Sequence, residues 1–124
     1  MGIYFNQPLN ITLSQLTNLT HLTLDYCFNQ ELEIPFNIHV LILGCNNKHL
    51  IENLPDSIVE LHLLENFNLE LSNLPSSIKT ISFHKNSSYN KELNNLPKSL
   101  EKLYLPQKYN IEIKTIYPKC QIIK

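Results

Sequence analysis

The sequence contains no arginine, no alanine and no tryptophan, and its 124 residues include only two glycines. All ten basic residues are therefore lysines, and the net charge is −1. Proteins that bind nucleic acid neutralise phosphates with a basic surface, and they commonly read guanine with arginine. We therefore expect no nucleic-acid partner. Because alanine is the best helix former, its absence also argues against a helical protein.

Other features are missing as well. No stretch approaches the length of apolar residues that a membrane span needs, and the N-terminus has no basic region followed by an apolar run. We expect neither a membrane association nor a signal peptide. Gly2 and Gly44 form no phosphate-binding loop, so we expect no cofactor. The three cysteines are an odd number without a C-x-x-C pair, which indicates reduced thiols and a cytoplasmic location.

What the sequence does contain is an internal repeat. Five segments follow the pattern L-x-x-L-x-L-x-x-N, with Cys27 and Lys108 in place of the last asparagine at the two ends. The second apolar position advances by 19, 20, 20 and 22 residues from one segment to the next. It is occupied by Leu22, Leu41, Leu61, Ile81 and Leu103. Self-similarity at such a period is typical of solenoids.

The repeat length decides what each unit can hold. Side chains alternate between faces within L-x-L, so the two apolar residues point inward from a short strand. The remaining residues are too few for a full helix with two loops, and a proline precedes each later strand. We therefore predict a leucine-rich-repeat-like solenoid over residues 1–124 as a single domain. It has a short parallel sheet on its concave face, extended or 3₁₀ segments on its convex side and little α-helix, with Ile122 and Ile123 in a last edge strand.

The last position of the pattern predicts a structural ladder. A stacked asparagine amide can donate and accept hydrogen bonds to the turns above and below it. We expect such a buried ladder at Cys27, Asn46, Asn66 and Asn86, and we expect it to end before Lys108.

Two short sequence motifs identify the kind of repeat more closely. The first is Phe5-Asn6-Gln7-Pro8-Leu9, and the second is L-P-x-S-I at Leu54 to Ile58 and again at Leu74 to Ile78. In these phrases the chain resembles the FNIP-repeat family, a relative of the leucine-rich repeats found mainly in social amoebae and in large DNA viruses of amoebae. The resemblance implies protein–protein interaction, a viral or amoebal origin, and no particular catalytic activity.

The outward strand residues would form the surface that a partner meets. Val40, Ile42 and Leu64 are predicted to form a small apolar patch there, with Tyr104 as an anchor beside it. The same three aliphatic residues are also consistent with scattered exposed side chains of no special function. His62 and His84 complete the candidate partner-binding residues on the concave face.

The repeat pattern brings no set of metal-ligating or catalytic side chains together. His21, His62 and His84 fall in three different columns of the predicted sheet, so we expect no metal site. A regular solenoid of this size offers no deep cleft for a Cys/His or carboxylate pair, so we expect no enzyme. Two functions remain. One is an interaction module with an unknown protein partner. The other is a structural protein, for instance of a virus particle, that forms homo-oligomers through uncapped ends and is cytoplasmic (in a host cell if viral).

Overall fold

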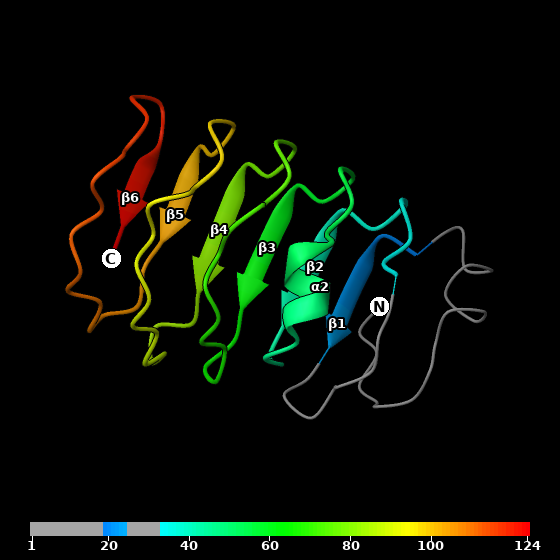
Figure 1. Ribbon diagram of the computed structural model, residues 1–124, viewed down its shortest axis with the longest axis horizontal. Coiled ribbons are helices and arrows are strands. Elements are labelled where there is room, and N and C mark those ends of the chain that lie inside the picture. Colours follow the sequence, from blue (N-terminus) through cyan, green and yellow to red (C-terminus); the bar gives the residue numbers. More distant parts are fainter. Residues whose placement is uncertain (1–18, 25–32) are drawn as a thin grey trace.

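The computed structural model describes residues 19–24 and 33–124, whose short strands lie side by side along one axis (Figure 1). The strands form one parallel sheet in the order β1-β2-β3-β4-β5-β6. They are β1 (His21–Leu24), β2 (Val40–Leu43), β3 (Glu60–Leu63), β4 (Thr80–Phe83), β5 (Lys102–Tyr104) and β6 (Gln121–Ile123). Each strand with its return segment is one rung of a solenoid. The predicted solenoid with a parallel sheet and little α-helix is confirmed in the described residues, and so is the edge strand at Ile122 and Ile123.

The sheet register explains why the repeat is so regular. Leu41 lies opposite Leu22 and Leu61, and the same row continues through Ile81 and Leu103 to the last strand. The row before each strand, and the row two residues further on, stack in the same way. In the rungs of β1 to β5 their members are buried with one exception, Leu105, which is half-buried beside the core, whereas Ile122 in the last rung is 37% exposed. The apolar columns of the sequence are thus the single continuous core of the described residues.

A turn before each strand ties successive rungs together. The carbonyl of Pro75 accepts a hydrogen bond from the backbone N–H of Ile78 at 3.3 Å, and the same bond recurs at Pro35, Pro55 and Pro97. Within the turn, the Ser77 hydroxyl donates to the carbonyl of Ile58 at 2.6 Å. Ser99 repeats this bond one rung later, and Asn37 replaces the serine by donating to the carbonyl of Leu19. The P-x-S phrase is therefore a connection between rungs at Ser77 and Ser99, whereas the buried hydroxyl of Ser57 makes no hydrogen bond.

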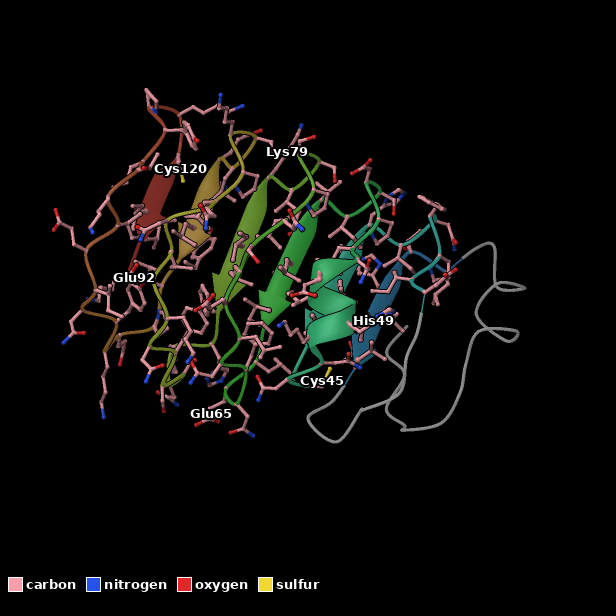
Figure 2. The ribbon with its side chains drawn as sticks, in the orientation of Figure 1. Cys45, His49, Glu65, Lys79, Glu92 and Cys120 are labelled. Carbon is pink, nitrogen blue, oxygen red and sulfur yellow. The ribbon has the colours of Figure 1, made fainter. Side chains whose placement is uncertain are left out.

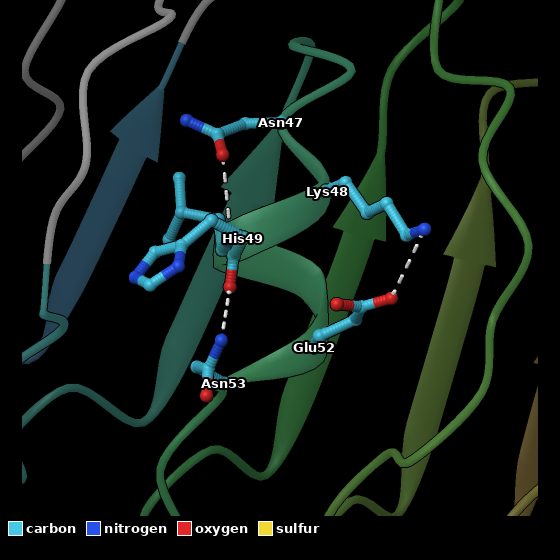
Figure 3. A network of polar contacts seen from close by, with 6 residues as sticks. Asn47, Lys48, His49, Glu52 and Asn53 are labelled. Atoms are coloured by element: carbon cyan, nitrogen blue, oxygen red, sulfur yellow. Dashed lines mark hydrogen bonds and ion pairs between the residues drawn. The ribbon is translucent and has the colours of Figure 1, made fainter.

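The described residues contain one helix, α2 (Lys48–Glu52), in the return segment after β2. The Asn47 side chain caps it by accepting from the N–H of Leu50 at 3.2 Å, and Asn53 donates to the carbonyl of His49 at 2.7 Å (Figure 3). Leu50 and Ile51 are buried against the core. The helix occupies the one return segment whose sequence departs most from the repeat.

Aromatic rings form a second stack inside the later rungs. The ring of Tyr89 lies 6.2 Å from those of Phe67 and Tyr109 in nearly parallel planes, and 4.5 Å from the tilted ring of Phe83. The Tyr89 hydroxyl donates to the carbonyl of Leu69 at 2.9 Å, two residues beyond the preceding ring. Tyr109 repeats this bond with Lys91 at 2.8 Å. Each tyrosine therefore buries a ring and satisfies its hydroxyl on the rung before it.

The predicted asparagine ladder is wrong at two of its positions. Asn66 and Asn86 are exposed, because a turn closes around each of them before the chain re-enters the core. Phe67 N–H donates to the carbonyl of Leu64, and Ser87 N–H donates to that of His84. Lys108 stands at the same turn corner in the next rung. Asparagine is favoured at such corners because its side chain suits turns, so the column records turn chemistry. Cys27 lies outside the described residues.

Asn46 does join two rungs, although it too is exposed. Its amide donates to the carbonyl of Asn66 at 3.1 Å and its carbonyl accepts from the N–H of Asn68 at 2.7 Å. The Asn68 side chain then accepts from the N–H of Asn90 at 3.2 Å. The side-chain bonds between rungs are thus made by the asparagine that comes directly after each ring. Cys45, which is 1% exposed, comes directly before Asn46 and so occupies the position that an aromatic residue has in later rungs.

Alanine replacements distinguish the asparagines that bond between rungs from those that stand at turn corners. We expect Asn46→Ala to lower the free energy of unfolding by about 0.5–1.5 kcal/mol, since it removes both side-chain bonds between rungs. The matched change Asn66→Ala removes only an exposed side chain, and it should stay within about 0.5 kcal/mol of the wild type. Urea unfolding followed by circular dichroism measures both, and equal losses would contradict the assignment.

The aromatic stack predicts alkaline sensitivity. Burial, followed by the neighbouring Tyr109 and Glu70, raises the pKa of Tyr89 well above its usual value. The unfolded chain loses this proton near pH 10 or so, whereas the folded chain keeps it, so the free energy of unfolding falls as pH rises past about 10. Tyr89→Phe should reduce this fall and cost about 0.5–1.5 kcal/mol at neutral pH through the lost hydrogen bond. Unfolding curves measured at neutral pH and above about pH 10 test this, with Tyr104→Phe on the sheet face as the control.

Candidate binding surface

The sheet has one face turned toward the core and one turned away from it, which we call the outer face. Two columns of side chains form this face, and the strand register places neighbours of each column opposite one another. The first column is His21, Val40, Glu60, Thr80, Lys102 and Gln121. The middle column is Thr23, Ile42, His62, Ser82, Tyr104 and Ile123. The alternation of side chains within L-x-L predicts both columns for β1 to β5.

The same alternation predicts a third outward column two residues further on, at Asp25, Gly44, Leu64, His84 and Pro106, but the described members do not form an outward row. Gly44 and Pro106 are buried, Leu64 is half-buried and His84 is exposed, while Asp25 lies outside the described residues. These positions follow the strands, where the backbone begins to turn. Side-chain alternation therefore no longer decides which way each residue points.

The apolar residues of the candidate patch lie on or directly after two neighbouring strands. Val40 and Ile42 stand two residues apart on β2, and both are half-buried. Leu64 follows β3, and its N–H donates to the carbonyl of Leu43 at 2.8 Å, which places it diagonally from Ile42. The backbone thus brings Leu64 near Ile42, and the three-residue apolar patch stays a prediction.

Polar groups flank this area. His62 lies directly opposite Ile42, and its Nε2 is 3.6 Å from a carboxylate oxygen of Glu60 on the same strand. The two side chains are 33% and 44% exposed, so a ligand could reach both. The outer face at β2 and β3 therefore combines an aliphatic centre with a carboxylate and an imidazole.

The expectation that Tyr104 borders the apolar patch is wrong. His62 and Ser82 stand between Ile42 and Tyr104 in the middle column, so three strand spacings of about 4.8 Å separate the two residues. Tyr104 instead neighbours Ile123 on β6. The six predicted contact residues therefore divide into a group at β2 and β3, Tyr104 at β5, and the exposed His84 after β4.

The histidines are also apart. His21 lies at the start of β1 and contacts the Thr20 hydroxyl at 2.8 Å through Nδ1, whereas the Nδ1 of His84 accepts from the N–H of Asn86 at 3.2 Å. Among residues 19–24 and 33–124, no three histidine, cysteine or acidic side chains gather as metal ligands would.

The two described cysteines stand far from each other. Cys45 follows β2 and is buried, while Cys120 precedes β6 at the other end of the sheet (Figure 2). Burial raises the pKa of the Cys120 thiol, which disfavours the reactive thiolate. Within the described part of the chain, no helix is long and apolar enough to cross a membrane.

One exposed residue was not anticipated. Phe36 is 80% exposed at the corner of the turn before β2. The equivalent corner holds Asp56, Ser76 and Lys98 in later rungs, so comparison of the repeats would have shown that an aromatic residue is out of place there.

Comparison with known proteins gives one match. A family model described as FNIP Repeat matches residues 46–86 and again residues 66–108, which together span half of the chain. No curated protein and no solved structure matches the chain significantly.

Proposed function

Because this chain belongs to the FNIP-repeat family and folds as a parallel β-solenoid, we propose that it is a non-catalytic protein–protein interaction module that binds its partner on the outer face of the sheet. The observation that carries this proposal is the composition of that face. It presents Ile42 and Val40 beside the Glu60–His62 pair on a rigid sheet.

The dimensions of the face suit a protein partner. Six strands at about 4.8 Å spacing extend roughly 24 Å, which is comparable to one side of a small protein interface. An apolar centre with polar groups around it is the common anatomy of such interfaces. The hydrogen bonds between rungs hold the backbone in place, so little conformational entropy is lost when a partner binds.

The proposed absence of catalysis rests on the described thiols and carboxylates. Cys45 is buried in the core, and the thiol of Cys120 has a raised pKa. Glu60 pairs with His62 on an open sheet face, where water keeps the carboxylate well solvated. We propose a cytoplasmic location, because the odd number of cysteines without a C-x-x-C pair indicates reduced thiols, and these persist in the cytoplasm.

Ile42→Asp tests the proposal. The substitution puts a charge at the centre of the apolar area, on a half-buried side chain outside the core, so we expect capture of the partner to fall about tenfold or more while the fold persists. Affinity capture from the native cell with quantitative mass spectrometry measures this, and circular dichroism verifies folding.

Ser88→Asp is the matched control, because it adds the same charge at an exposed position in the turn after β4. The specific partners are the proteins that both the wild type and the Ser88→Asp variant capture. If a folded Ile42→Asp protein retains them equally, binding does not use the outer face.

A further inference from the structure

The charges of this chain are divided between its two halves. Residues 1–78 contain eight acidic residues and a single lysine, for a net charge of −7. Residues 79–124 contain nine lysines and three acidic residues, for a net charge of +6. The near-neutral total therefore conceals a strong separation of charge.

The fold turns the separation of charge along the sequence into a separation of charge along the axis of the solenoid. Successive rungs advance along one axis from β1 to β6, so rungs far apart in sequence are far apart in space (Figure 1). The strands up to β3 lie in the acidic half, and β4 to β6 lie in the lysine-rich half. The half of the described solenoid from β1 to β3 is consequently negative, with most of its carboxylates between β2 and β4, and the half from β4 to β6 is positive.

The exposed apolar side chains follow the same division. Three large apolar residues are prominently exposed among the described residues, and none lies in the middle rungs. Phe36 stands in the acidic half, whereas Ile116 and Ile122, at 52% and 37% exposure, stand in the last rung.

Each of these apolar sites is accompanied by charge. Phe36 borders an open groove of about 550 Å³ that is also lined by Glu33, Glu52 and Asp56. Glu52 contacts Lys48, the single lysine of this half, at 3.7 Å. Ile116 stands between the exposed Lys114 and Lys119. An apolar residue among carboxylates beside β2 and β3 thus matches apolar residues among ammonium groups in the last rung.

We propose that this protein associates head to tail with further copies of itself, the lysine-rich last rung of one copy docking against the acidic groove beside Phe36 of the next. The contact is heterologous, because two different surfaces of the same chain meet. A heterologous contact that does not close into a ring propagates as a filament. The outer face of the sheet takes no part in this contact, so association is independent of the proposed partner binding.

Salt provides the first test on the unmodified protein. Sedimentation velocity at increasing concentration in about 0.02 M salt should show assembly, and about 0.5 M salt should weaken it about tenfold or more by screening the charges. A monomer at every concentration in low salt overturns the proposal, and so does assembly that is insensitive to salt.

Two variants identify the surfaces. Phe36→Lys places a positive charge in the acidic groove, and Ile116→Asp places a negative charge in the lysine-rich rung. Both residues are more than half exposed, so we expect both variants to fold. Each alone should remain monomeric. The matched controls Asn95→Lys and Asn95→Asp, at an exposed position between β4 and β5, should assemble like the wild type.

Mixing the two variants gives the sharpest result. The Phe36→Lys copy keeps an intact lysine-rich rung, and the Ile116→Asp copy keeps an intact groove, so an equimolar mixture should form one-to-one dimers and stop there. A mixture that stays monomeric overturns the head-to-tail contact, and so do variants that assemble like the wild type. Ile42→Asp should assemble normally, so the two proposals can fail separately.

Discussion

The structure depends on one constraint, which is that every rung must place the same chemical groups at the same height as the rung before it. Parallel pairing in register puts Leu41 opposite Leu61 and Leu61 opposite Ile81, so each buried side chain packs on its equivalents. The hydroxyl-to-carbonyl bonds of Ser77 and Ser99 and the tyrosine bonds to the previous turn obey the same rule. A rung cannot bury its apolar residues alone, and its neighbours supply the missing surface.

This constraint leaves the outer face free to vary. Side chains such as Ile42, His62 and Ser82 follow one another in a single column without sharing size or charge, because this face is turned away from the core. The same freedom applies to turn corners, where Phe36 and Asp56 occupy equivalent places. Residues suited to binding can therefore change from rung to rung without disturbing the core.

The sequence predicted the buried columns well because burial acts on every rung alike and so leaves a periodic trace. It predicted the asparagine column poorly, since Asn46, Asn66 and Asn86 align in sequence but not in space. Turns of different length separate the strand from the ring in each rung, so Asn68 and Asn90, and not Asn66 and Asn86, continue the bonds made by Asn46. Helix α2 also lay beyond the pattern, because its cap and its buried Leu50 and Ile51 occur in one rung. The candidate patch followed from strand alternation, which holds at Val40 and Ile42 and ends at Gly44 and Pro106.

Cys45 marks a point where the interior stack changes character. Phe67, Tyr89 and Tyr109 each contribute a ring to one stack, and the two tyrosines add a hydroxyl that bonds to the rung before, whereas the rung of β2 contributes a small thiol at that level. In a quasi-one-dimensional array, cooperativity is set by the coupling between nearest neighbours. The rungs of β3, β4 and β5 consequently share a coupling through their rings that the rung of β2 lacks.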